Sequence, residues 1–93
     1  MLYTVYILYS VQYDKIYIGY TSNLLQRFIS HNELSATGWT VHFRPWQVIY
    51  CEYFSIKAEA VKREKALKSS QGRKWIRQQQ QLTFASKGFI SVG

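Results

Sequence analysis

The sequence predicts an α+β domain in which helices flank a three-stranded antiparallel sheet, in the order β-β-α-β-α-α. Two runs of β-branched and aromatic residues open the chain, a third lies near its middle, and apolar residues recur at helical spacing after the second and third runs. With 93 residues, 47% of them hydrophobic, the chain suits one compact core. We therefore assign residues 1–80 to a single domain and leave the structure of the tail, residues 81–93, open.

The first 20 residues predict a β-hairpin. Residues 3–9 and 16–20 are rich in Val, Ile and Tyr, and the segment between them has the length of a hairpin loop. Side chains alternate along a strand, so the Val and Ile side chains share one face while Tyr6 and Tyr17 project from the other. Tyrosines in strands are commonly no more than sheet cover, and the pattern alone leaves their role open.

A first helix should follow, from an N-cap within residues 21–23 to about residues 32–34. Arg27 and His31 are four residues apart and therefore share a helix face. This pair suits contact with a phosphate, because arginine offers a planar fork of donors. A surface arginine beside a histidine at the helix end would give the same spacing.

The second half of the domain is predicted to contain a long loop, a strand and two helices. Residues 33–46 lack a steady period and are expected to form the loop. Residues 47–54 predict the third strand, and Ser55 should cap a second helix that ends at Lys68. A short basic helix is expected over about residues 73–80.

Glu64 occupies a position where an apolar residue is expected. It shares the inner stripe of the second helix with Ala60 and Leu67, whereas Glu59 lies about 140° away and should face outward. An inward carboxylate is costly without a partner. One candidate partner is Mg²⁺, which is typically held by one or two carboxylates with water and phosphate oxygens; an ion pair with Arg27 is the other.

The charge balance points to an anionic partner. Twelve Lys and Arg residues against five Asp and Glu residues give a net charge of +7, and eight of the cations lie between positions 57 and 77. Such a cluster is typical of a protein that binds a polyanion, and a solvated helix face has the same composition.

Several protein classes are disfavoured by the composition. No apolar stretch approaches the ~18 residues of a membrane span, and residues 1–8 lack the basic region and cleavage site of a signal peptide. A single cysteine, Cys51, excludes an internal disulfide and a cysteine zinc cluster. We expect a soluble, cytoplasmic protein.

An ordered set of residues resembles the GIY-YIG nuclease family, in particular its small stand-alone bacterial members. The set comprises Thr4-Val5-Tyr6, then Tyr17-Ile18-Gly19 about ten residues later, then Arg27, His31 and the helical Glu64. The likeness covers roughly residues 2–78.

The resemblance implies metal-dependent hydrolysis of a nucleic-acid phosphodiester. By that likeness, Tyr6 and Tyr17 position or deprotonate the attacking water, and Arg27 stabilises charge on the scissile phosphate. His31 assists in orientation or proton transfer. Glu64 holds a single divalent metal, Mg²⁺ or Mn²⁺.

The same likeness gives a structural role to Gly19, which would let the backbone pass close to the phosphate or to the neighbouring helix. Two positions depart from the family pattern. Thr4 stands where the family name has its first glycine, in a strand that can accommodate a side chain. Tyr20 stands where some relatives carry lysine, so Lys15 or Arg44 would have to supply that cation.

The leading hypothesis is an endonuclease that acts on DNA in preference to RNA, with structure selectivity suited to repair or recombination. The residues expected to contact nucleic acid are Lys15, Tyr20, Arg44, Lys62, Arg63, Lys65, Lys68, Arg73 and Lys74. The alternative is a catalytically weak or inactive DNA- or RNA-binding module that uses the same basic face, with Trp39, Phe43 and Trp46 stacking on unpaired bases. A third reading is an interaction protein whose basic face meets an acidic partner.

Overall fold

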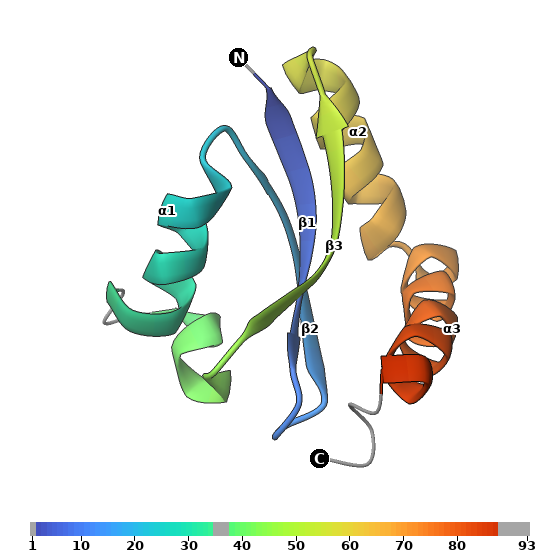
Figure 1. The fold of residues 1–93 in the computed structure, drawn as a ribbon. Helices are drawn as coiled ribbons and strands as arrows, with labels where there is room; N and C mark the ends of the chain where they lie inside the picture. The colour runs from blue at the N-terminus through green and yellow to red at the C-terminus, as the bar shows by residue number, and fades with distance from the viewer. Residues whose placement is uncertain (1, 35–37, 88–93) are drawn as a thin grey trace.

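The computed structural model describes residues 2–34 and 38–87 of the chain. Within them three antiparallel strands form one sheet, and Figure 1 shows helices on both of its faces. The central strand β1 (Tyr3–Ser10) pairs with β2 (Lys15–Thr21) on one side and with β3 (Gln47–Phe54) on the other. β2 and β3 are therefore the edge strands of the sheet.

The helices follow the strands in the predicted order. α1 (Leu24–Ile29) continues into a π-helical turn, η1 (Ser30–Leu34), and the 3₁₀ turn η2 (Trp39–Phe43) packs beside it on the same face of the sheet. α2 (Lys57–Lys68) and α3 (Ser70–Lys87) lie on the opposite face (Figure 1). The α+β class and the order β-β-α-β-α-α are thus confirmed.

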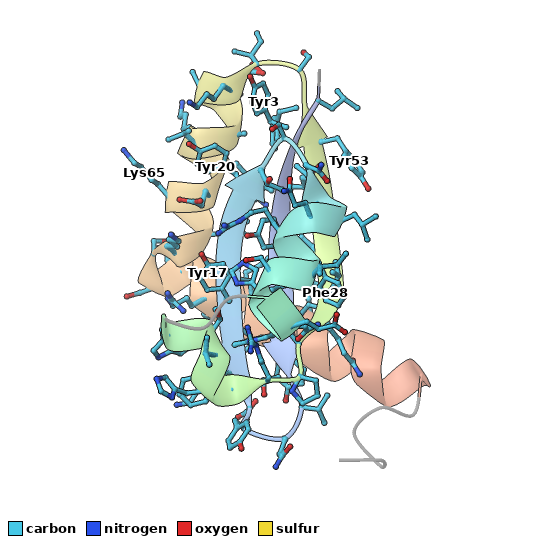
Figure 2. The ribbon with its side chains drawn as sticks, turned by 90° about the vertical axis from the view of Figure 1, so that its left-hand side faces the viewer. Tyr3, Tyr17, Tyr20, Phe28, Tyr53 and Lys65 are labelled. Carbon is cyan, nitrogen blue, oxygen red and sulfur yellow. The ribbon has the colours of Figure 1, made fainter. Side chains whose placement is uncertain are left out.

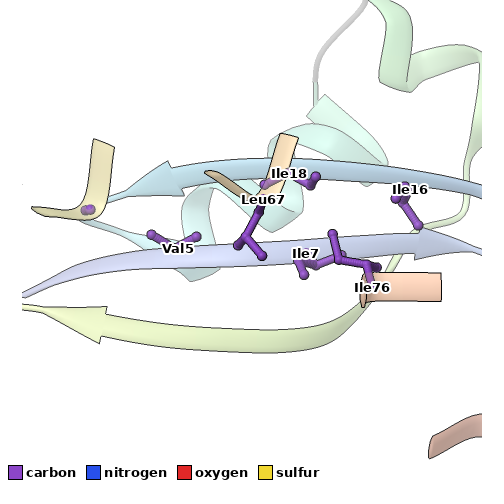
Figure 3. Packing of buried hydrophobic residues seen from close by; sticks show 7 residues of the cluster. Val5, Ile7, Ile16, Ile18, Leu67 and Ile76 are labelled. Atoms are coloured by element: carbon purple, nitrogen blue, oxygen red, sulfur yellow. The ribbon is translucent and has the colours of Figure 1, made fainter. Parts of the chain in front are cut away.

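The sheet face toward α2 and α3 carries an aliphatic core, which Figure 3 shows from close by. Its buried members are Val5, Ile7, Ile16, Ile18, Ala60, Leu67 and Ile76. Strand alternation places the Val and Ile side chains on this face, as the sequence predicts. Burial of each large aliphatic side chain stabilises the fold by about 1.5–3 kcal/mol.

The opposite face carries an aromatic layer. Its buried members are Tyr6, Leu8 and Trp46, with Tyr17, Leu24, Phe28, Phe43 and Cys51 packed against them. The side chain of Asn32 ties η1 to the start of β3, because its Oδ1 accepts from the Trp46 N–H at 2.6 Å and its amide donates to the Trp46 carbonyl at 3.0 Å. Both faces of the sheet are therefore covered.

Residues 33–46 differ from the long loop that the sequence predicts. The segment contains the end of η1 and the whole of η2, with residues 35–37 outside the described part. Trp46 is only 2% exposed and donates its indole N–H to the Thr40 carbonyl at 2.9 Å, so the expectation that it stacks on bases is wrong. Trp46 and Phe43 of this segment pack in the aromatic layer and hold the segment to the sheet, whereas Trp39 is 49% exposed.

The start of α2 also differs from the prediction. Ser55 was expected as its cap, but the helix begins at Lys57 and its N-cap residue is Ile56. The Ile56 carbonyl accepts the first hydrogen bonds of the helix, from the N–H groups of Glu59 and Ala60. No side chain caps this end of α2.

α3 begins earlier and ends later than the short helix predicted over residues 73–80. Ser69 caps its first turn, since its Oγ accepts from the Gly72 N–H at 3.1 Å. A Cβ at Gly72 would overlap the carbonyl oxygens of Ala66 and Leu67, so glycine lets α3 start directly against the end of α2. The helix crosses the expected boundary at residue 80, and residues 88–93 of the tail lie outside the described part.

Candidate active site

A buried tyrosine and a buried histidine form the centre of the site. Tyr6 is fully buried on β1, and its Oη lies 3.1 Å from Nε2 of His31 on η1. The other ring nitrogen of His31, Nδ1, lies 3.1 Å from Oγ1 of Thr40 on η2. Tyr17 completes the group from β2, with its ring centroid 4.6 Å from that of His31. Tyr6 and Tyr17 therefore share a face, as the strand pattern predicts.

Gly19 makes room for the two tyrosine rings. It lies directly opposite Tyr6 in the β1–β2 pairing. A Cβ at Gly19 would lie 2.6 Å from the Tyr6 hydroxyl oxygen and 3.1 Å from Cε1 of Tyr17. The close approach at this glycine is thus made by the tyrosines of the site, which the sequence did not indicate.

Arg27 joins this group from the last turn of α1. The pKa of Arg27 is raised by its interactions with the hydroxyl groups of Tyr6 and Tyr17. Burial raises the pKa of Tyr6 to about 12, and the neighbouring Tyr17 and Glu64 add to the increase while Arg27 opposes it. Tyr6 is consequently a neutral hydrogen-bonding group at physiological pH.

His31 is held in its neutral form. Burial lowers its pKa, and the positive charges of Arg27 and Arg44 lower it further. Arg44 also fixes the backbone of this turn, donating to the carbonyls of His31 at 2.5 Å and Ser30 at 3.1 Å. The Arg44 guanidinium therefore binds the backbone of η1 and stabilises the turn that carries His31.

Glu64 approaches the same site from the other layer. Its side chain is 16% exposed, and its charge acts on the Tyr6 hydroxyl. Oε1 of Glu64 lies 3.3 Å from Nζ of Lys68, so the ion pair that the structure records is with Lys68 and not with Arg27. Glu59 is exposed, as the helix geometry predicts.

The five side chains meet at the β2 edge of the sheet, and we call them the edge cluster: Tyr6, Tyr17, Arg27, His31 and Glu64. The sheet supplies the tyrosines, the α1 layer supplies the cation and the imidazole, and α2 supplies the carboxylate. In Figure 2, α1 and α2 flank β2, with Tyr17 on the strand between them. Of these side chains Arg27 is exposed and Tyr17 is half-buried, so these two can be reached from solvent, whereas Tyr6 and His31 are buried.

A metal ion at this site would depend on one carboxylate. Among residues 2–34 and 38–87 there is no group of three or more His, Cys, Asp or Glu side chains that could hold a metal. The Glu64 carboxylate nevertheless fits Mg²⁺, a hard cation that typically keeps several waters and binds one or two carboxylates with phosphate oxygens. For the metal to bind, the Glu64 carboxylate would have to release its ion pair with the Lys68 ammonium.

Some of the basic residues predicted to bind nucleic acid line two different hollows. Lys15, Lys68 and Arg73 line a groove of about 510 Å³ beside Tyr17. Lys62 and Arg63 line a second hollow, of about 440 Å³, that none of the edge cluster lines.

The remaining predicted contacts are placed differently. Arg63 is engaged by Glu52, with its Nε 3.0 Å from Oε1 and its Nη2 2.9 Å from Oε2. Tyr20 is half-buried against the aliphatic core. Figure 2 shows Lys65 pointing outward from α2, and Lys74 is exposed on α3.

Sequence reasoning missed Thr40 as a contributor to the site, and it named Trp39 and Arg77 without placing them beside the edge cluster. Thr40 holds the histidine, but the aperiodic segment around it carries no local signal for that contact. Trp39 was considered only as one of several loop aromatics, and Arg77 only as part of the basic cluster. Both line the groove beside Tyr17.

The fold and the edge cluster define a class: a small α+β domain with the side chains that phosphodiester chemistry needs, namely a cation, a carboxylate and proton-carrying groups at one sheet edge. Comparison with known families identifies it further. The GIY-YIG catalytic domain matches residues 2–79, and the chain belongs to the GIY-YIG family, whose members are nucleases.

The chain is also similar to curated bacterial proteins named UPF0213. It is 39% identical over 54 residues to one from Staphylococcus saprophyticus, covering 58% of this chain and 66% of that protein. It is 38% identical over 56 residues to one from Staphylococcus haemolyticus, covering 60% and 68%. A protein from Bacillus pumilus is 33% identical over 67 residues, covering 72% and 63%. The chain thus spans about two thirds of the length of these relatives.

In the described part of the chain, every helix is too short or too polar to cross a membrane.

Proposed function

We propose that this chain is a metal-dependent endonuclease that hydrolyses phosphodiester bonds of nucleic acid, DNA in preference to RNA, in structures that arise during repair or recombination. One observation carries the proposal. Tyr6 and His31 are hydrogen-bonded at 3.1 Å beside an arginine and within electrostatic reach of Glu64. A cation, a carboxylate and proton-carrying side chains are the types of group that the attack of water on a phosphodiester uses.

Arg27 would bind the scissile phosphate. Its side chain is exposed, and its pKa is raised by its contacts with both tyrosines, so it stays charged at every relevant pH. A planar guanidinium can donate two parallel hydrogen bonds to phosphate oxygens. Charge stabilisation of this kind is usually the largest single contribution to catalysis.

Glu64 would hold the divalent ion, Mg²⁺ or Mn²⁺, which on binding supplies Lewis-acid activation of the phosphate and a more acidic water. The low exposure of the Glu64 side chain on α2, 16%, and its charge acting on Tyr6 support this role. Lys68, its present ion-pair partner, would then be free to turn toward a phosphate oxygen.

Tyr6 and His31 would relay a proton. With a pKa of about 12, Tyr6 does not act as a phenolate at neutral pH. In one tautomer His31 donates Nδ1–H to Thr40 and accepts the Tyr6 proton at Nε2. As water attacks, its proton passes to the Tyr6 oxygen while the Tyr6 proton passes to His31. The negative charge of the bound phosphate offsets the positive charge of Arg27 and favours the resulting imidazolium.

The test is cleavage of end-labelled single-stranded, duplex, flap and branched DNA, and of the matching RNAs, in Mg²⁺, Mn²⁺ or EDTA. Glu64→Gln is compared with Glu59→Gln, an outward carboxylate on the same helix. We expect metal-dependent products that vanish with Glu64→Gln and persist with Glu59→Gln. Cutting that is unaffected by EDTA, or by Glu64→Gln, would overturn the metal assignment.

A second candidate is a binding module without significant catalysis. The observation in its favour is the ion pair between Glu64 and Lys68, which neutralises the carboxylate of the edge cluster. Salt-sensitive oligonucleotide binding without cutting of any of these substrates, in either metal, would support it over the endonuclease.

A further inference from the structure

A groove runs beside the edge strand β2, next to the edge cluster. It measures about 510 Å³, and we call it the β2 groove. Its lining includes four cations and two aromatic side chains: Lys15, Lys68, Arg73, Arg77, Tyr17 and Trp39. The cations come from β2, α2 and α3, whereas Trp39 comes from η2 in the other layer.

The β2 groove is continuous with the edge cluster. Tyr17 belongs to both, because its ring contacts His31 and also lines the groove. Lys68 links them a second time through its ion pair with Glu64. A polymer whose reacting phosphate lies in the edge cluster would therefore continue along this groove toward Lys15, at the start of β2.

The charge of the β2 groove suits a phosphate backbone. Among the described residues that line it, the one acidic side chain is that of Asp14, which pairs with Arg77 at 2.5 Å. Lys15 and Arg73 are exposed, and Nε of Arg73 donates to the Lys68 carbonyl at 3.2 Å, which orients its guanidinium. Two cations are thus accessible, and Lys68 is half-exposed beside them.

Trp39 offers a stacking surface at the same groove. It is 49% exposed, which is unusual for an indole, and its ring is backed by Phe43 at 4.7 Å and by the buried Trp46 at 5.8 Å between centroids. An exposed aromatic ring on a fixed support stacks on an unpaired base, whereas the bases of a continuous duplex are already stacked on each other.

We propose that the β2 groove binds an unpaired nucleic-acid strand next to the scissile phosphate, with its cations on the backbone and Trp39 stacked on a base. This inference rests on the proposed function, which makes the edge cluster the place where the phosphodiester is cut. Tyr17 and Lys68 connect the groove to that cluster. It specifies the substrate class: a flap, a splayed end or a single strand is preferred over continuous duplex.

Binding without cleavage tests the proposal. In a Glu64→Gln background with EDTA, fluorescence anisotropy measures the affinity for a labelled single-stranded oligonucleotide and for a hairpin duplex, both as DNA and as RNA. Loss of one stacked base costs about 5- to 150-fold in affinity. We expect Trp39→Ala to weaken single-strand binding within this range and duplex binding less than about twofold. Single-strand binding should change the indole fluorescence of the parent, and this change should be absent in Trp39→Phe.

A matched pair of lysines tests the charged part of the groove. Lys15→Gln, in the groove, should weaken single-strand binding and reduce the salt slope by about 0.7, the value for one phosphate contact. Lys57→Gln removes an exposed charge at the far end of α2 and should leave both quantities near the parent values. Circular dichroism confirms that each variant is folded.

Three outcomes would overturn the proposal: no preference for the single strand, equal losses for single strand and duplex with Trp39→Ala, or equal losses with the two lysine variants. None of these depends on catalysis. If the protein never cuts nucleic acid, preferential single-strand binding in the β2 groove can still be measured. If it cuts and Trp39→Ala changes neither binding nor cleavage, the proposed function stands and the β2 groove is excluded as the binding site of the strand.

Discussion

The two faces of the sheet are built for different purposes. On the face toward α2 and α3, the fully buried side chains among the described residues are aliphatic, such as Ile7, Ile18 and Leu67. The face toward α1 buries Tyr6 and Trp46, and near them the polar side chains of His31 and Thr40. Burying a polar group costs free energy. On the second face, hydrogen bonds offset this cost and hold the polar groups in fixed positions.

The comparison predicts that changes on the two faces separate stability from activity. On the aliphatic face, Leu67→Ala should lower the free energy of unfolding by about 2–5 kcal/mol, because Leu67 is 1% exposed and a cavity would remain. Urea denaturation measures this loss. Cleavage by the folded fraction should stay at the parent rate, and a large fall in that rate would show that the faces are not independent.

On the α1 face, we expect Arg27→Ala to lower the cleavage rate strongly and to leave the stability nearly unchanged. Removal of a group that stabilises transition-state charge typically costs about 10²–10³-fold in rate. The side chain is exposed, so the midpoint of urea denaturation should hardly move. Single-turnover cleavage measures the effect, with Arg27→Lys as a second variant. A retained charge without the planar fork should restore only part of the rate.

Gly19→Ala should affect both properties. The new methyl group would meet the Tyr6 hydroxyl and the Tyr17 ring, and crowding of this kind costs about 1–3 kcal/mol. The displaced Tyr6 would lose its hydrogen bond to His31, so the rate should fall further than the loss of stability explains. An alanine variant with normal cleavage would show that the Tyr6–His31 contact is dispensable.

The smallest effect concerns pH. The pKa of His31 is lowered in the folded protein by burial and by Arg27 and Arg44, so the unfolded chain binds the proton more readily. Stability from neutral His31 is fully present above the ordinary histidine pKa and is lost as the pH falls toward the lowered value. Urea denaturation between pH 7.5 and 5 should show a steeper acid loss for the parent than for His31→Gln. Parallel curves of unfolding free energy against pH for the parent and His31→Gln would contradict this prediction.

The elements with a local signal were predictable. Period-2 alternation located the hairpin and put Tyr6 and Tyr17 on one face, and Asn23 caps α1 as expected by accepting from the Gln26 N–H at 3.1 Å. Helical spacing placed Glu64 inward. These features depend on residues close to each other in the chain, which is why a sequence pattern records them.

What the sequence did not predict depends on contacts between distant residues. The bond from His31 to Thr40 and the burial of Trp46 arise because η2 folds back on the sheet, and no periodic pattern accompanies that packing. Likewise, α3 begins at Ser70 because Gly72 fits against the end of α2, whereas locally the same residues resemble a break. The residues of the edge cluster could therefore be named from the sequence, whereas the contacts that hold them in place could not.

The most direct test of the central claim is the single-turnover cleavage of a flap DNA in Mg²⁺ by Tyr6→Phe, beside Tyr53→Phe. Tyr6→Phe removes only the hydroxyl that contacts His31, and Tyr53 is 63% exposed on the β3 edge strand. Proton transfer by a positioned side chain contributes about 10²–10⁴-fold. We predict a loss within that range for Tyr6→Phe and the parent rate for Tyr53→Phe. A Tyr6→Phe protein that cuts at the parent rate would contradict the assignment of the edge cluster as the catalytic centre.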